Sequence, residues 1–316
     1  MEDPIIQAFH QAHADAIKTT GGSIYNSQQV EGLSTISPST PLSATLHLLN
    51  GEIININLNQ NKRFLIQSCF KPLTYAYAIE HNLSKQVNQS IGKTGDIGYA
   101  ANTLDTTGKA FNPLINTGAL AVLELLARHG HTLDTIGKWC RDLGTTKTMN
   151  SDNTASTSSS SLFNAAAVTA TEADSLRNRG LACMMAAAGI MPKTQTSVDS
   201  AVQYYAAMDC LSINTLELAS IAAAFASTES VLSSQTKSSV LASMLHCGMY
   251  EASGVWMSEV GLPAKSGVSG AVWCVIPGVG GLAAYQPLID EVGNSVQAMA
   301  LIKSFVKSVP SLSIFL

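Results

Sequence analysis

A serine and a lysine three positions apart are the first candidates for catalysis. Ser68 and Lys71 stand where a β-forming run gives way to a helical pattern with Pro72 in its first turn. If a helix begins at Ser68, both side chains share one helical face. Partial burial and the helix dipole favour a neutral lysine there, and a neutral amine can deprotonate a serine hydroxyl. The alternative is a helix-capping serine and a solvated lysine.

This spacing alone is weak support, because serine precedes lysine by three positions elsewhere in the chain. Those places are Ser90–Lys93, Ser234–Lys237 and Ser304–Lys307.

A second candidate is the segment Gly261–Gly270, which contains Lys265-Ser266-Gly267. A Lys-Ser-Gly strand beside a nucleophile can lend a backbone N–H to an oxyanion, although a glycine-rich strand start is the alternative. With the upstream serine and lysine, the segment resembles the penicillin-recognising serine hydrolases. Ser151-Asp152-Asn153 supplies their third element, but it lies in a Ser/Thr-rich stretch where such a tripeptide arises easily. Those enzymes act outside the cytoplasm, so this interpretation ranks second.

Longer strings in one order decide between these interpretations. They are Phe64–Lys71, Asn112–Ala119, His246–Tyr250 and Gly261–Gly270, followed by Gly293-Asn294-Ser295. Together they closely resemble the serine-dependent glutaminases, from about residue 23 to residue 295. The resemblance implies a β-lactamase-like fold and cofactor-free hydrolysis of L-glutamine to L-glutamate and ammonia through a γ-glutamyl ester.

The resemblance also implies which residues carry the reaction. Ser68 is the expected nucleophile and Lys71 its general base. Tyr250 is expected near both, where it relays a proton or holds the serine. The backbone amides of Ser68 and Val268 are expected to form the oxyanion hole.

Four further residues are expected to bind the substrate. Asn116 and Asn178 match the residues that hold the α-carboxylate end, and Tyr205 matches the one that closes the pocket. Glu172 resembles the acid that meets the α-amino group. It precedes Asn178 by six residues where the family has seven, so Asp174 remains a rival.

Other departures concern the surroundings of the nucleophile. Phe70 replaces a small residue, the segment Gly92–Gly95 lacks the family's acid, proline and serine, and Tyr25 is only a candidate contact. A non-catalytic amino-acid-binding relative is therefore a further alternative.

The surrounding pattern predicts an α+β fold in one catalytic domain of residues 1–316. Apolar spacing predicts helices over 4–18, over most of 72–247 and over 296–306. Asn50-Gly51 between two β-rich runs predicts a hairpin, and strands are expected again from about 254 to 286. An antiparallel sheet lobe (about 1–70 and 248–316) would therefore carry an inserted all-α lobe (about 71–247).

Composition excludes several function classes. Only 13% of residues are charged, the net charge is −4 and no basic run occurs, so we expect no nucleic-acid partner. No signal peptide is apparent, the six cysteines form no C-x-x-C pair, and Pro277-Gly278 interrupts the apolar stretch 270–289. We therefore expect a cytoplasmic protein without a membrane or nucleic-acid partner. The resemblance implies that it needs no metal or cofactor and assembles as a homodimer or homotetramer.

Overall fold

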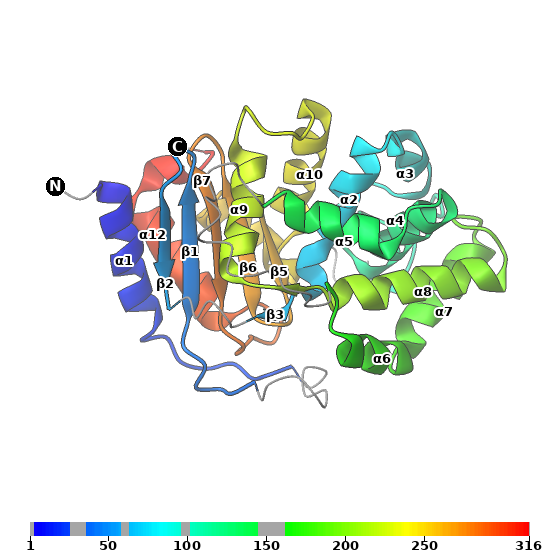
Figure 1. Cartoon of the computed structure of the whole chain (residues 1–316), viewed down its shortest axis with the longest axis horizontal. Helices are drawn as coiled ribbons and strands as arrows, with labels where there is room; N and C mark the ends of the chain where they lie inside the picture. Colours follow the sequence, from blue (N-terminus) through cyan, green and yellow to red (C-terminus); the bar gives the residue numbers. More distant parts are fainter. Residues whose placement is uncertain (1–2, 26–35, 58–62, 96–101, 145–161, 316) are drawn as a thin grey trace.

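The computed structural model describes residues 3–25, 36–57, 63–95, 102–144 and 162–315. A five-stranded antiparallel sheet with the strand order β2-β1-β7-β6-β5 lies at one side of the molecule (Figure 1). Its strands are β1 (Ser43–Leu48), β2 (Ile53–Ile56), β5 (Ala264–Gly267), β6 (Ala271–Ile276) and β7 (Gly280–Tyr285). The sheet is therefore built from both ends of the chain, as expected.

Tight turns join neighbouring strands of this sheet. β1 and β2 pair across Asn50-Gly51, with Leu46 opposite Ile54, which confirms the predicted hairpin. β6 and β7 pair across Pro277–Val279, where the Val279 amide donates to the Ile276 carbonyl over 3.0 Å. The stretch 270–289 is thus a pair of buried strands. Within the described ranges, no helix is both long and apolar enough to cross a membrane.

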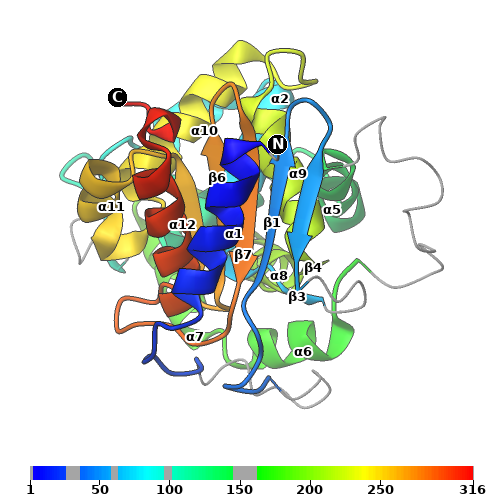
Figure 2. The ribbon, with the colours of Figure 1, turned by 90° about the vertical axis from the view of Figure 1, so that its left-hand side faces the viewer.

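Helices cover both faces of the sheet. α1 (Pro4–Ala16) and α12 (Val296–Ser308) lie side by side on one face (Figure 2), where the rings of Phe9 and Phe305 are 5.6 Å apart. α9 (Thr215–Ala226) packs on β1, β6 and β7 and covers the other face. The buried His47 of β1 contacts Ser220 of α9 at 2.9 Å, so a polar contact links strand and helix.

The position of α9 differs from the expected lobe boundaries. The sequence placed residues 71–247 in the helical lobe, yet this helix belongs to the sheet layer. The cause is the amino-acid composition of α9. Leu218, Ile221, Ala222 and Phe225 are buried, and the alanine side chains of the helix are small enough to let it lie close to β7. The chain therefore packs α9 against the sheet, leaves the sheet to form α10, and re-enters it at β5.

Helices α2 to α8 and α10 form the second lobe, toward the right in Figure 1. α2 packs against α4, α5 and α10, while α4, α7 and α8 contact one another. Their bounds are α2 (Lys71–Glu80), α3 (Ser84–Ser90), α4 (Asn116–Arg128), α5 (Leu133–Asp142), α6 (Ala165–Ala173), α7 (Leu176–Ala187), α8 (Gln195–Asp209) and α10 (Ser234–Cys247).

Two short segments differ from the sequence expectation. β3 (Phe64–Leu65) does not join the main sheet but pairs with β4 (Ser212–Ile213). Residues 253–259, expected to open the second run of strands, form α11 (Ser253–Glu259) instead, and β5 begins at Ala264. Trp256 of α11 is buried and donates its indole N–H to the Leu262 carbonyl over 2.8 Å, which anchors this helix beside the strand. Ser151-Asp152-Asn153 lies outside the described residues.

Candidate active site

Ser68 lies on a short turn that connects β3 to α2. This 3-10 turn spans Gln67–Phe70, and the helix begins directly at Lys71. Gln67 has a left-handed backbone with φ 42°, which is unusual for a residue other than glycine. A strained backbone conformation of this kind persists only where the surrounding structure imposes it. At Gln67 it turns the chain sharply just before Ser68.

Cys69, although adjacent to Ser68, faces the sheet. Its thiol is fully buried and lies 3.5 Å from the carbonyl oxygens of Lys265 and Ala271. Burial raises the pKa of this thiol to about 12, which keeps it protonated and a poor nucleophile. Ser68, by contrast, faces a pocket.

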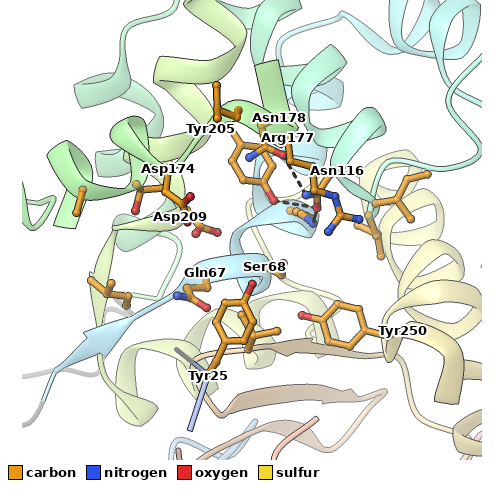
Figure 3. A pocket seen from close by; sticks show the side chains of 18 of the residues that line it. Tyr25, Gln67, Ser68, Asn116, Asp174, Arg177, Asn178, Tyr205, Asp209 and Tyr250 are labelled. Atoms are coloured by element: carbon orange, nitrogen blue, oxygen red, sulfur yellow. Dashed lines mark hydrogen bonds between the residues drawn. The ribbon is translucent and has the colours of Figure 1, made fainter. Parts of the chain in front are cut away.

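That pocket has a volume of about 1310 Å³ and is lined from both lobes. Figure 3 shows side chains from the serine turn and several helices converging on it. Residues expected from the sequence that line it are Ser68, Lys71, Asn116, Asn178, Tyr205, Tyr250 and Val268, together with the candidate contact Tyr25.

Lys71 is held inside a hydrogen-bond network rather than in solvent. It is 2% exposed, and its Nζ donates to Asn116 Oδ1 over 2.7 Å. The hydroxyl of Tyr205 donates to the same oxygen over 3.0 Å, and the Asn116 amide donates to Asn178 Oδ1 over 3.1 Å. The solvated alternative for Lys71 is therefore wrong. This network holds the amine in the same pocket that Ser68 lines.

Tyr250 reaches the pocket from the segment after α10. Its backbone is left-handed with φ 53°, and burial raises the pKa of its phenol, an effect that the neighbouring Ser68 hydroxyl partly offsets. Its ring lies 4.3 Å from Nζ of the fully buried Lys265 of β5. The cation over the ring fixes the phenol's position within the pocket.

Close backbone packing brings β5 and the end of α10 beside the serine. A Cβ added to Gly248 would lie 1.7 Å from the Ala264 carbonyl oxygen, so only glycine fits there. A Cβ on Gly267 would lie 3.1 Å from the carbonyl oxygen of Ile66, just before the serine turn. The Lys-Ser-Gly segment therefore packs against the turn that carries Ser68.

The structure does not bring Glu172 into the pocket. Ala166, Thr169, Ala170, Thr171 and Ala173 of α6 line the pocket, while Glu172 is exposed and does not line it. Asp174, the rival, caps α6 and does line the pocket. The expected contact of Glu172 with a substrate amine stays a prediction, with Asp174 as its rival.

Asp209 is a pocket residue that no sequence motif indicated. It ends α8 one helical turn after Tyr205, so both residues lie on the same face of that helix. Burial raises the pKa of its carboxyl to about 7, and the charge of Lys71 opposes this rise. The four-residue spacing from Tyr205 was the available signal.

A metal centre finds no support in the described part of the chain. Three or more histidine, cysteine or acidic side chains do not gather there in an arrangement that could hold an ion.

Comparisons with known proteins place these features in a family. The family model described as Glutaminase matches residues 26–315, which is most of the chain. The chain belongs to the glutaminase family. The glutaminase of Desulfovibrio desulfuricans is 30% identical over 310 residues, covering 95% of this chain and 94% of the relative. Glutaminase 1 of Escherichia coli strain K12 is 27% identical over 312 residues, with the same two shares covered.

Solved structures of glutaminases share the fold. The probable glutaminase ybaS superposes with a TM-score of 0.80 at 25% identity, covering 98% of both chains. The structure of Mglu in its tris and glutamate form gives a TM-score of 0.82 at 26% identity, covering 99% of this chain and 68% of that one. The predicted family, the glutaminase enzyme class and the α+β, β-lactamase-like fold are thereby confirmed.

Proposed function

We propose that this glutaminase hydrolyses L-glutamine to L-glutamate and ammonia through an ester on Ser68. The observation that carries the proposal is the position of Lys71, which is buried, lines the same pocket as Ser68 and is hydrogen-bonded to Asn116. Burial disfavours the charged ammonium and so favours the neutral amine that a general base must be.

In the first half of the reaction, Lys71 takes the proton of the Ser68 hydroxyl. The serine oxygen then attacks the γ-carbonyl carbon, and the negative charge moves to the carbonyl oxygen. The backbone N–H groups of Ser68 and Val268 stabilise that oxyanion. Lys71 returns the proton to the amide nitrogen, the C–N bond breaks, and ammonia leaves.

Water completes the reaction in the second half. Lys71 takes a proton from the water, whose oxygen attacks the ester carbon, and the bond to Ser68 breaks as its oxygen regains the proton. Tyr250, which lines the same pocket, relays this proton or holds the serine. The buried Lys265 beside its ring keeps the phenol in place.

Substrate recognition falls to the amide network above the nucleophile. Asn116, Asn178 and Tyr205 are already hydrogen-bonded to one another, so their orientation is set before the substrate arrives. We assign them the α-carboxylate end of glutamine. Such preorganisation reduces the entropy lost on binding.

Ammonia release by the purified protein tests the proposal directly. L-Glutamine should give stoichiometric ammonia and L-glutamate, and L-asparagine, shorter by one methylene, should react far more slowly. Nitrocefin serves as the probe for a penicillin-recognising hydrolase. Glutamine binding by calorimetry without ammonia release would indicate a non-catalytic relative and would contradict the proposal.

A further inference from the structure

Phe70 stands directly before Lys71, at a position where the resemblance leads us to expect a small side chain. It is the last residue of the 3-10 turn that carries Ser68, and its ring is fully buried. Phe70 does not line the pocket, so a bound substrate does not touch it. An effect of this ring on the reaction must therefore pass through a neighbour that does line the pocket.

That neighbour is Tyr205 of α8. The rings of Phe70 and Tyr205 meet edge to face, with their centroids 5.3 Å apart and their planes at 82°. Aromatic pairs prefer this geometry, because the positive edge of one ring meets the negative face of the other. A small residue in place of Phe70 would offer Tyr205 no such contact. The aromatic pair therefore joins the serine turn to α8.

Tyr205 in turn holds the side chain to which Lys71 is hydrogen-bonded. Burial raises the pKa of the Tyr205 phenol well above its usual value, so the hydroxyl keeps its proton. Figure 3 shows this hydroxyl directed at Asn116, whose Oδ1 accepts from it over 3.0 Å and from Lys71 Nζ over 2.7 Å. The hydroxyl is rigidly attached to its ring, so a contact that fixes the ring also fixes the donor.

The contact between Phe70 and Tyr205 does not depend on the charge of Lys71. Lys71 Nζ lies 5.6 Å from the centroid of the Tyr205 ring, and such a contact is attractive while the amine is protonated. In the proposed reaction the amine is neutral when it takes the serine proton, so the cation–π attraction is then lost. Because Phe70 is uncharged, its ring keeps the contact in both states and holds Tyr205 throughout the reaction.

We propose that Phe70 is a positioning residue that holds Tyr205 in the orientation that binds the α-carboxylate end of glutamine. This inference rests on the proposed function, which assigns Tyr205 and Asn116 to that end of the substrate, and it names the residue that fixes their geometry. A phenol that is already held in place loses little freedom when the substrate binds. The benefit falls on KM and not on kcat, because Lys71 keeps its own hydrogen bond to Asn116.

Steady-state ammonia release by Phe70→Leu tests this role. We expect the KM for L-glutamine to rise by about 3- to 10-fold, which is the free energy of an aromatic pair expressed as a ratio, with kcat within about 2-fold of wild type. Phe225→Leu is the matched control, because Phe225 is a buried residue of α9 whose ring lies 5.9 Å from that of Trp273, outside the pocket. A general loss of stability would lower the folded fraction of both variants, whereas only Phe70→Leu should raise KM.

A double-variant cycle shows whether Phe70 acts through Tyr205. Tyr205→Leu removes the ring on which Phe70 packs and should raise KM by itself. Adding Phe70→Leu to Tyr205→Leu should change KM by less than about 2-fold, since the contact is already absent. If Phe70→Leu does not fold by circular dichroism, Phe70→Met replaces it throughout, because the longer, flexible methionine fills the space without fixing the tyrosine ring.

Several results would overturn the inference. They are an unchanged KM in folded Phe70→Leu, a lower kcat without a change in KM, an equal rise of KM in Phe225→Leu, and effects of the two substitutions that multiply in the double variant. A wild-type KM in Tyr205→Leu would instead contradict the role given to Tyr205 in the proposed function. A wild-type protein that releases no ammonia from glutamine would contradict the proposed function as a whole.

Discussion

Burial separates Lys71 from the other lysines that follow a serine by three positions. Lys93 and Lys307 are exposed, and Lys237 is half-buried and donates to the Ser227 carbonyl over 3.0 Å. Lys71 alone of these four lysines combines burial with a place in the pocket. Spacing brings a lysine near a serine, but only a dry environment favours the neutral amine.

Replacing this lysine should nearly abolish turnover. We expect Lys71→Met to lower kcat by more than the ~10²–10⁴-fold typical of a general base, because Ser68 and Asn116 also lose their positions. Lys93→Met, an exposed lysine with the same spacing, is the control and should stay within about 2-fold of wild type. Steady-state ammonia release measures both, and near-normal kcat in Lys71→Met would exclude the lysine as base.

The Asp209 carboxyl should make stability depend on pH. Its pKa is raised by burial from 3.8 to about 7, so the folded protein holds this proton more tightly than the unfolded chain does. Its contribution to stability is therefore complete below about pH 4 and is lost as the pH rises through about 7. Asp209→Asn removes the penalty, so its Tm relative to wild type should be more favourable at pH 8 than at pH 5. Differential scanning calorimetry at both pH values checks this prediction. An equal difference in Tm between Asp209→Asn and wild type at pH 5 and pH 8 would refute the raised pKa of Asp209.

Helix register accounts for what motif matching missed at the scale of elements. The resemblance assigned Glu172 to the substrate amine, whereas of these two acids only Asp174, which follows the last residue of α6, lines the pocket. Asp209 belongs to no string, and only its position one turn after Tyr205 on α8 indicates the pocket. A sequence motif identifies which segment lies at the site. The face of a helix that points into the pocket depends instead on how that helix packs against its neighbours.

The contact between α10 and β5 is a second element-scale feature that can be tested. Gly248→Ala places a Cβ against the Ala264 carbonyl oxygen, so the helix end must move and carry Tyr250 with it. We expect a loss of about 1–3 kcal/mol in the free energy of unfolding, typical of overpacking, together with a lower kcat. Gly254→Ala, whose Cβ would meet no atom within 4 Å, should be neutral or stabilising by up to about 1 kcal/mol. Urea unfolding and ammonia release compare the two, and equal effects would show that this contact does not position the site.

Across the whole molecule, much of the architecture could be predicted because its signals are local. Asn50-Gly51 gave the hairpin, Pro277-Gly278 marked the turn between β6 and β7, and both ends of the chain were assigned to one sheet. The place of α9 could not be predicted, since a helix that is apolar on nearly all sides carries no narrow stripe that indicates its partner. The pairing of β3 with β4 joins residues far apart in sequence, and no local pattern specifies such a contact.

The central claim is that Ser68, and not its neighbour Cys69, forms the covalent intermediate. A glutamine analogue that carries an electrophilic diazoketone in place of the γ-amide should label the protein once, and peptide mass spectrometry should locate the adduct on Ser68. Ser68→Ala should abolish both labelling and ammonia release, while Cys69→Ser should retain most of each, because the cysteine thiol faces the sheet. An adduct on Cys69, or ammonia release that survives in Ser68→Ala, would contradict the account.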